Sequence, residues 1–189
     1  MERLLQHLTD MHHIDEALRD DLRNSFRELR IPKGEFLIRE GRICRHLYFL
    51  EQGCLRGFYN LDGREVTHWF GFENDFVTSF HSFTTREPAI ESIQLLEDCI
   101  LWEIPKSKLD ELLAAHHKAE RLLRMAYEKY YIRLEERYVN AQFKTAPELY
   151  GRLLERMPHI IERVPLGYIA SYLGMSQETL SRARGRLSR

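Results

Sequence analysis

Apolar residues recur at two different periods along the chain, and the change of period divides it into parts. From Ile14 to Leu29 apolar side chains are three or four residues apart, which predicts an amphipathic helix. From Ile31 to Ile104 the pattern changes to short alternating or continuous apolar runs punctuated by glycines, which is typical of antiparallel strands. Helical spacing returns after Pro105. The chain is therefore predicted to be an α+β protein.

The strand-like part predicts a small antiparallel barrel or roll. Short apolar runs separated by glycine turns are the usual sign of such folds. The pair Asp62-Gly63 between two runs is a strong signal for a tight hairpin turn. The runs that we expect to form strands are residues 35–38, 47–50, 55–59, 66–70, 90–95 and 99–104.

A long helical region follows Pro105, with a short first helix that ends at His116-His117. Beyond it, apolar and tyrosine residues are alternately four and three residues apart, which is the spacing of a coiled-coil seam. A single broad core face in a monomer is the alternative, and Arg137 falls within the seam. A second stripe at Met125, Ile132 and Val139 is expected to pack on the roll. The dimer interface is predicted at Leu123, Tyr127, Tyr130, Leu134 and Ala141.

Two short helical patterns follow Val164, after a helix predicted from Thr145 to about Pro158. Gly174 suits the left-handed conformation that ends a helix, and Ser176 is a good N-cap for the next one. Two helices joined by such a turn predict a helix-turn-helix. The apolar residues of its two helices are Ile169, Ala170, Leu173, Leu180, Ala183 and Leu187.

The second of these helices carries side chains that suit DNA. Exposed residues near the start of a recognition helix meet base edges in the major groove, where arginine pairs with guanine and glutamate accepts from cytosine. The alternative is a surface pair of helices whose polar face is only solvated. We expect DNA contacts from Ser176, Gln177, Glu178, Ser181, Arg182, Arg184 and Arg186.

Charge supports this interpretation only locally. The 189 residues carry 28 Lys and Arg against 29 Asp and Glu, which does not mark the whole chain as a nucleic-acid binder. From Arg163 onward there are five arginines and one acid, so positive charge gathers at the C-terminal end. Solvated arginines that favour a helix C-terminus would account for the same pattern.

Candidate chemistry elsewhere is sparse. The three cysteines are widely spaced without a C-x-x-C pair, which favours free thiols over a disulfide, zinc or iron–sulfur site. No nucleophile motif or phosphate loop occurs, so we predict a protein that is not an enzyme and has no catalytic residue, metal or cofactor. A signal peptide and an apolar stretch of ~20 residues are also lacking, which predicts a cytoplasmic protein without membrane contact.

The order of these parts resembles the Crp/Fnr family of bacterial transcription regulators. Besides the segment after Val164, the resemblance rests on P-K-G-E at 32–35, R-E-G at 39–41, L-Y-F-L-E-Q-G at 47–53, D-G-R-E at 62–65 and N-D-F at 74–76. It implies a cyclic-nucleotide-binding-like jelly roll with its N-terminal helix at 1–105, a short helix and dimerisation helix at 106–145, and a helix-turn-helix domain at 146–189.

The resemblance also implies partners. They are a second copy of the chain, double-stranded DNA with a palindromic site, RNA polymerase, and a small-molecule effector whose existence is left open. Glu178, Ser181 and Arg182 are similar to the E-x-x-S-R pattern of the Fnr-like branch, which implies TTGA-like half-sites. Since the chain ends at Arg189, we expect no β-hairpin wing after the recognition helix.

The nucleotide site that the family implies is degenerate in this sequence. Nucleotide-binding members have a Gly-Glu pair and an Arg eleven residues after the Gly, which hold phosphate and ribose. Here Thr78 and Ser79 stand at the pair and Ala89 at the arginine position. Arg86 lies three residues earlier, and with Thr78 and Ser79 it is the candidate effector site. We therefore expect that cyclic AMP is not the effector.

Two alternatives from other classes stay open. One is a ligand- or protein-binding roll whose helix-turn-helix no longer reads DNA. The other is a metalloenzyme of cupin type, which would hold a metal with a His-x-His pair and a Glu. His68, Glu73 and His81 occur, but no His-x-His pair does, so this second alternative is the weaker one.

Overall fold

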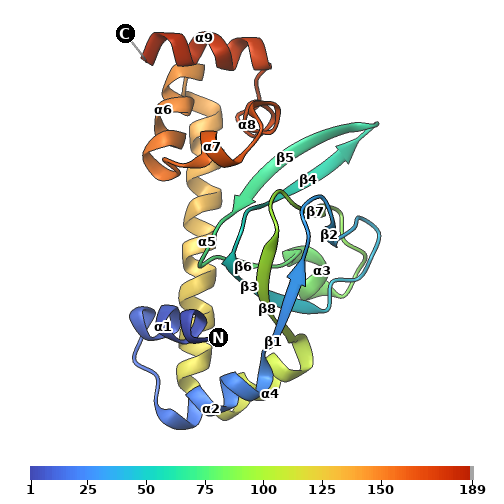
Figure 1. The fold of residues 1–189 in the computed structure, drawn as a ribbon, viewed down its shortest axis with the longest axis vertical. Helices are drawn as coiled ribbons and strands as arrows, with labels where there is room; N and C mark the ends of the chain where they lie inside the picture. The colour runs from blue at the N-terminus through green and yellow to red at the C-terminus, as the bar shows by residue number, and fades with distance from the viewer. Residues whose placement is uncertain (188–189) are drawn as a thin grey trace. The chain divides into compact units, whose positions relative to one another are not determined.

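Two four-stranded antiparallel sheets form the β-roll (Figure 1). The computed structural model describes residues 1–187, with side chains as far as residue 185. One sheet has the strand order β1-β8-β3-β6 and the other the order β2-β7-β4-β5. In chain order the strands are β1 (Arg27–Ile31), β2 (Phe36–Ile38), β3 (His46–Gln52), β4 (Leu55–Leu61), β5 (Arg64–Gly71), β6 (Phe76–Val77), β7 (Ser92–Leu95) and β8 (Cys99–Pro105).

The six strands expected from the sequence are confirmed as β2, β3, β4, β5, β7 and β8. The turn between β4 and β5 is the predicted pair Asp62-Gly63, and both residues have positive φ, as a two-residue hairpin turn requires. In the first sheet, Leu101 of β8 pairs with Leu29 of β1 on one side and Leu50 of β3 on the other. Leu50 and Leu101 are fully buried, so the register gathers apolar side chains into the core.

The predicted helix from Ile14 to Leu29 is wrong at its C-terminal end. The helix α2 covers Glu16–Ser25, and Leu29 lies in β1. The helix ends here because the next residues pair along the whole of β1 with β8, and this pairing outweighs the helical spacing. The sequence also did not reveal α1 (Glu2–Met11), β6 or the six-residue helix α3 (Phe80–Thr85).

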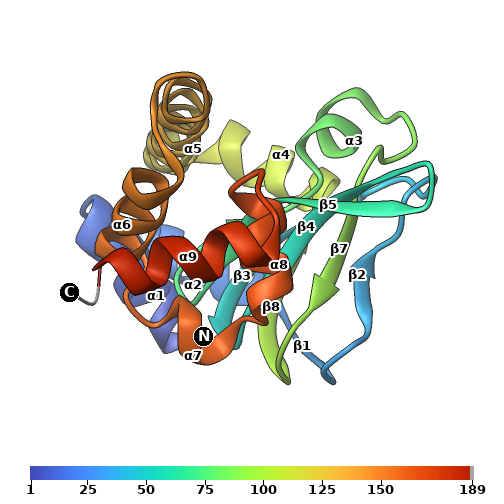
Figure 2. The same cartoon turned by 90° about the horizontal axis from the view of Figure 1, so that it is seen from above.

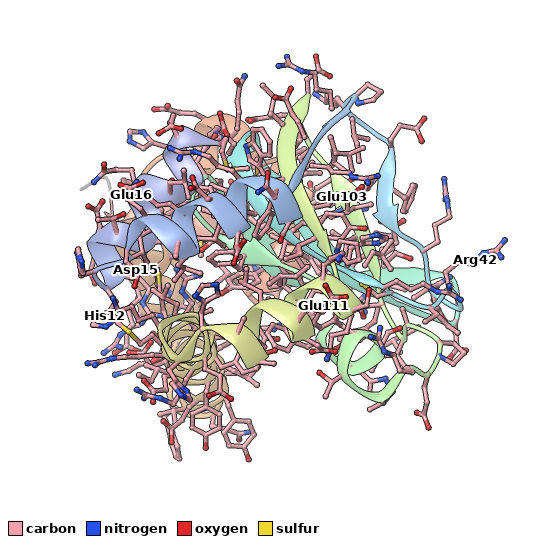
Figure 3. The ribbon with its side chains drawn as sticks, turned by 90° about the horizontal axis from the view of Figure 1, so that it is seen from below. His12, Asp15, Glu16, Arg42, Glu103 and Glu111 are labelled. Atoms are coloured by element: carbon pink, nitrogen blue, oxygen red, sulfur yellow. The ribbon has the colours of Figure 1, made fainter. Side chains whose placement is uncertain are left out.

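Asp15 fixes the start of α2. Its carboxylate accepts a hydrogen bond from the Leu18 amide at 3.0 Å, which is the role of an N-cap residue. Figure 3 labels Asp15 and the first helical residue, Glu16. It also accepts from Lys118 Nζ at 2.7 Å, at the beginning of the long helix. These hydrogen bonds, that of Lys118 above all, lower the pKa of Asp15. The first helical turn of α5 is thereby tied to α2.

The helices after the roll follow the predicted order. The expected end of the first helix at His116 is confirmed, since the helix C-cap lies there. Thr145 begins the next helix, with its amide and hydroxyl both donating to the Glu148 carboxylate at 2.8 Å, and these bonds lower the pKa of Glu148. The helices are α4 (Lys106–Ala115), α5 (His117–Phe143), α6 (Ala146–Arg156), α7 (Ile160–Arg163), α8 (Leu166–Tyr172) and α9 (Gln177–Leu187).

The chain divides into two compact units. One comprises Met1–Gly57 and Phe70–Lys129, and the other Phe58–Trp69 and Tyr130–Arg189. The second unit thus combines the end of the β4–β5 hairpin, the C-terminal half of α5 and the helices α6 to α9. The three-part division at residues 105 and 145 stays a prediction. Within the part of the chain that the structure describes, no helix is both long and apolar enough to cross a membrane.

Candidate DNA-binding surface and effector site

The segment predicted to be a helix-turn-helix contains two helices, α8 and α9, which follow one another and pack together (Figure 2). The end of α8 has the hydrogen bonds of a Schellman motif: the Met175 amide donates to Ala170 O at 3.0 Å and the Gly174 amide to Ser171 O at 3.1 Å. Gly174 has a φ of 69°, the left-handed value that this motif needs. The turn is thus set by its own backbone.

The start of α9 is capped as the sequence predicts. Ser176 Oγ accepts from the Thr179 amide at 3.1 Å. Thr179 occupies the position where a glutamate would complete a capping box, and its hydroxyl instead contacts Ser176 Oγ at 3.0 Å. Residues of the apolar faces lie in the core of this unit, including Ile169, Ala170, Leu180 and Ala183, all buried.

The N-terminal half of α9 presents polar side chains to solvent. Glu178, Ser181 and Arg182 are exposed, and Glu178 Oε1 lies 3.7 Å from Arg182 Nη2. Two candidate base readers therefore pair with each other across one helical turn. Both are well exposed, at 80% and 68% of their side chains, so the pair contributes little to stability and opens easily when a base offers a better partner.

The other predicted DNA contacts on α9 have different surroundings. A Cβ built on Gly167 would lie 2.5 Å from Gln177 Nε2, so the Gln177 amide rests against the start of α8. Arg184 is half-buried on the same helix. The side chains of Arg186 and Arg189 lie outside the described residues. Of the seven predicted DNA contacts, the six whose side chains are described come from a single helix and its cap.

The candidate effector residues do not form a cluster. Thr78 is buried and donates to His46 O at 2.9 Å, and Ser79 is buried with an Oγ that has no hydrogen-bond partner among the described residues. Arg86 stands at the other end of α3, in a left-handed conformation, with its guanidinium 5.7 Å from the Phe83 ring. Ala89 is buried. The position of the family arginine is thus occupied by a buried, uncharged side chain.

The predicted dimer seam runs along α5 and is largely uncovered. Tyr127, Tyr130, Leu134 and Ala141 are exposed, and Leu123 is half-buried. The second stripe does not behave as expected, because Ile132 and Val139 are exposed rather than buried in a core.

A contact between the β4–β5 hairpin and α8 was not foreseen from the sequence. The Thr67 amide donates to Ser171 Oγ at 3.0 Å, and Ser171 Oγ donates to Glu65 O at 3.4 Å. Arg137 of α5 donates to His68 O and lies over the Tyr172 ring at 5.0 Å. Burial lowers the pKa of Arg137. In the sequence, the presence of Arg137 in an otherwise apolar seam was the only indication that this residue has a different role.

The histidines of the metalloenzyme alternative have other neighbours. The His68 ring stacks on Tyr59 with 4.2 Å between centroids, and His81 Nε2 lies 3.6 Å from Glu87. Glu73 accepts from the Gly53 amide at 3.0 Å. Within the described residues, no three His, Cys, Asp or Glu side chains are grouped so that they could hold a metal ion.

Comparison with known proteins finds a matching domain family for the roll and solved structures with a similar fold. Residues 28–116 match the cyclic nucleotide-binding domain family. FixK2 from Bradyrhizobium japonicum is 21% identical with a TM-score of 0.74, over 86% of this chain and 84% of that one. The c-di-GMP responsive global regulator CLP from Xanthomonas campestris is 18% identical with a TM-score of 0.68, over 92% of each chain. The search of curated proteins finds no match.

A third solved structure carries the family name itself. A protein of the Crp/Fnr family from Eubacterium rectale is 18% identical with a TM-score of 0.69, over 93% of this chain and 84% of that one. Likeness at such identities establishes a common fold, and in each case it covers at least 86% of this chain. The chain therefore has the fold of these Crp/Fnr-like proteins, and its residues 28–116 match the cyclic nucleotide-binding domain family.

Proposed function

We propose that the protein is a transcription regulator that binds a pseudo-palindromic DNA site as a homodimer. The observation that carries this proposal is the α8–α9 pair, in which a Schellman turn and the Ser176 cap hold Glu178, Ser181 and Arg182 on one exposed face. CLP, which has the same fold over 92% of this chain, is described as linking cell-cell signalling to virulence gene expression. RNA polymerase is the partner that such a regulator would meet at a promoter.

The variant Arg182→Ala tests whether Arg182 recognises a base in the DNA site. A bidentate contact with guanine contributes about 1–3 kcal/mol of discrimination, so the variant should bind its cognate site about 5- to 150-fold more weakly and lose preference at one base pair of each half-site. Lys108→Ala, an exposed cation on α4 in the other compact unit, is the control and should bind as the wild type does. Equal weakening on every DNA sequence would mean that Arg182 contacts only phosphate.

Dimerisation is supported by α5, whose apolar and tyrosine side chains are exposed over several turns. Leu134 is 47% exposed, and Tyr138 and Phe143 are more exposed still, at 69% and 78%. Contiguous apolar surface of this kind on a helix marks an interaction site. A second copy of the chain supplies the same surface and the two-fold symmetry that a palindromic site needs.

The degenerate nucleotide site supports a roll that does not respond to cyclic AMP. Ser79 and Ala89 are buried and uncharged, and the guanidinium of Arg86 lies over Phe83 at the far end of α3. A cyclic phosphate placed there would lose its solvation without gaining a charged partner. Calorimetric titration with cyclic AMP should show no binding, and saturable binding at micromolar concentrations would refute this part of the proposal.

A further inference from the structure

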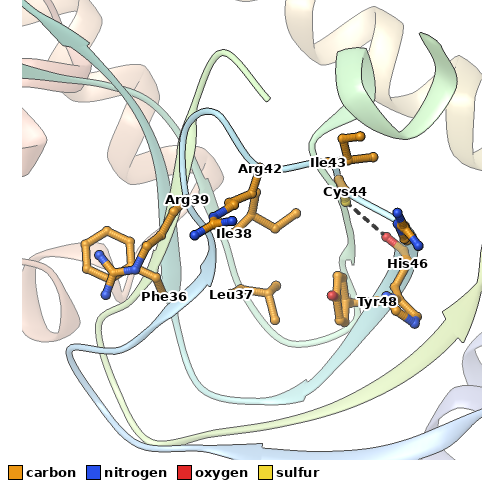
Figure 4. A pocket seen from close by; sticks show the side chains of 10 residues that line it. Phe36, Leu37, Ile38, Arg39, Arg42, Ile43, Cys44, His46 and Tyr48 are labelled. Atoms are coloured by element: carbon orange, nitrogen blue, oxygen red, sulfur yellow. Dashed lines mark hydrogen bonds between the residues drawn. The ribbon is translucent and has the colours of Figure 1, made fainter. Parts of the chain in front are cut away.

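A half-open pocket of about 330 Å³ lies between β2, the loop of residues 39–45 and the start of β3 (Figure 4). We call it the loop pocket. Three arginines line it, Arg39, Arg42 and Arg45, and none of its lining residues is a carboxylate. The candidate effector residues Thr78, Ser79 and Arg86 do not line it, although Thr78 contacts the lining residues Cys44 and His46. The loop pocket is therefore lined by residues other than those of the candidate effector site.

The charges of the loop pocket are not neutralised by the protein. Within the part of the chain that the structure describes, no ion pair joins Arg39, Arg42 or Arg45 to a carboxylate. Arg39 is held in place by the Phe36 ring, with its Cζ 3.8 Å from the ring centroid. Arg42 extends into solvent at the rim (Figure 3). Three cations that line one pocket without an ion pair create a positive potential that favours a bound anion.

Tyr48 adds a hydroxyl donor to the wall of the loop pocket. The residue is only 7% exposed, yet its hydroxyl has no hydrogen-bond partner among residues 1–187. Figure 4 shows it across the pocket from Leu37. Burial, with Cys44 and Glu103 nearby, raises the pKa of Tyr48, so the hydroxyl keeps its proton. The hydroxyl is therefore available to donate a hydrogen bond to a ligand oxygen.

The loop that carries the arginines is already fixed in place. The Gly41 amide donates to Ala89 O at 2.8 Å, the Ala89 amide donates to Arg42 O at 2.9 Å, and the Cys44 amide donates to Ser82 Oγ at 2.8 Å. Binding therefore does not have to order the loop, which reduces its entropic cost. The same bonds link the loop to α3 and to the segment after it.

We propose that the loop pocket binds a small organic carboxylate with an apolar body. The fork of a guanidinium matches a carboxylate with two parallel hydrogen bonds, and the Tyr48 hydroxyl supplies a third donor. Leu37, Ile38 and Ile43 provide apolar wall for the body of the ligand. The volume lies at the lower end of the range for ligand sites, about 300–1,000 Å³. This site does not depend on DNA binding.

Benzoate is the probe for this proposal, and inorganic phosphate tests the effect of charge alone. The full chain is titrated with each by calorimetry and by amide chemical shifts. Benzoate should bind saturably with one site per chain, and the shifts should concentrate in residues 36–48. Phosphate should bind at least tenfold more weakly, because it lacks the apolar body.

Two variants locate the site. Arg42→Gln should weaken benzoate binding about tenfold, since a charge-assisted pair becomes a neutral contact, and Tyr48→Phe should weaken it about fivefold through the loss of one donor. Arg27→Gln removes an exposed cation on β1, away from the loop pocket, and should leave the affinity unchanged. Circular dichroism of each variant checks that the fold is retained.

Three results would overturn the proposal. They are the absence of saturable benzoate binding to the wild type, phosphate binding as tightly as benzoate, and benzoate binding that survives both Arg42→Gln and Tyr48→Phe. The first would mean that the loop pocket has no such ligand, the second that charge alone is recognised, and the third that benzoate binds elsewhere.

Discussion

Gly53 lies between β3 and β4, at a position that has no room for a side chain. Its φ is +108°, and a Cβ built there would lie 2.5 Å from Cys99 Sγ and 2.9 Å from Asp98 O. Its amide donates to Glu73 Oε1 at 3.0 Å, which fixes the backbone from the other side. Neither the backbone carbonyl of Asp98 nor the buried thiol of Cys99 can move aside without disturbing β8.

We expect Gly53→Ala to lower the free energy of unfolding by about 2–4 kcal/mol, because strain at positive φ adds to a steric clash. Urea denaturation measures it. Gly34→Ala is a matched control, since Gly34 has a φ of +88° but nothing within 4 Å of an added Cβ. That variant should lose only about 1 kcal/mol. Equal losses in the two variants would show that the contacts with residues 98 and 99 are unimportant.

Arg137 shows why the seam of α5 could be predicted only in part from the sequence. Spacing alone places it among the dimer residues, whereas in the structure its guanidinium donates to His68 O and lies over Tyr172. Residues 68 and 172 are far from 137 in sequence. A heptad pattern contains no information about such contacts, so an arginine in an apolar seam indicates an exception without revealing its partner.

Hydrogen bonds join the β4–β5 hairpin to α8 within the second unit. Ser171 is the common point, because its hydroxyl accepts from the Thr67 amide and donates to Glu65 O. Thr67 is fully buried. A buried amide that loses its acceptor costs about 1–3 kcal/mol, which is the free energy available to keep the hairpin on α8.

Ser171→Ala should therefore loosen this contact without unfolding the chain. The amide of Thr67 should exchange with solvent about 5- to 150-fold faster in hydrogen-exchange measurements, in proportion to the loss of about 1–3 kcal/mol. Ser181→Ala, on the exposed face of α9, removes a hydroxyl of the same kind and should leave the exchange of Thr67 as it is. Unchanged exchange in Ser171→Ala would mean that the hydrogen bond does not hold the hairpin.

Turns and caps, which act within a few residues, were predicted well from the sequence, whereas one helix boundary and one pocket that depend on distant pairing were not. The Asp62-Gly63 turn, the Gly174 turn and the Ser176 cap each act within a few residues, and the structure has all three. The boundary between α2 and β1 depends on pairing with β8, some seventy residues later, so helical spacing carried the predicted helix too far to Leu29. The loop pocket was missed for the same reason, since β2 and β3 belong to different sheets.

At the scale of the whole molecule, the exposed face of α5 leads to a testable prediction about dimerisation. Leu134 lies in the middle of the predicted seam and is 47% exposed. Leu134→Glu would bring two carboxylates together at the centre of a symmetric interface, so we expect a dimer in the wild type and a monomer in this variant by sedimentation analysis. Leu134→Met keeps the apolar volume and should remain dimeric. A variant with Glu that stayed dimeric would place the interface elsewhere.

The distance between the two α9 helices of a dimer follows from the same two-fold symmetry. In a two-fold dimer the two α9 helices would enter successive major grooves about 34 Å apart, so the half-sites should repeat after about one turn of DNA. Because Glu178, Ser181 and Arg182 occupy the reading face, the half-sites should resemble TTGA, as the E-x-x-S-R pattern implies.

Selection of binding sites from random duplex DNA by the wild-type protein, at near-physiological salt and without added ligand, tests the central claim most directly. The account predicts enrichment of a pseudo-palindrome with TTGA-like arms about one helical turn apart, and loss of that preference in Arg182→Ala. A wild-type selection that enriches no sequence, both alone and after addition of metabolites from a cell extract, would contradict it and leave a ligand- or protein-binding roll whose helix-turn-helix does not read DNA.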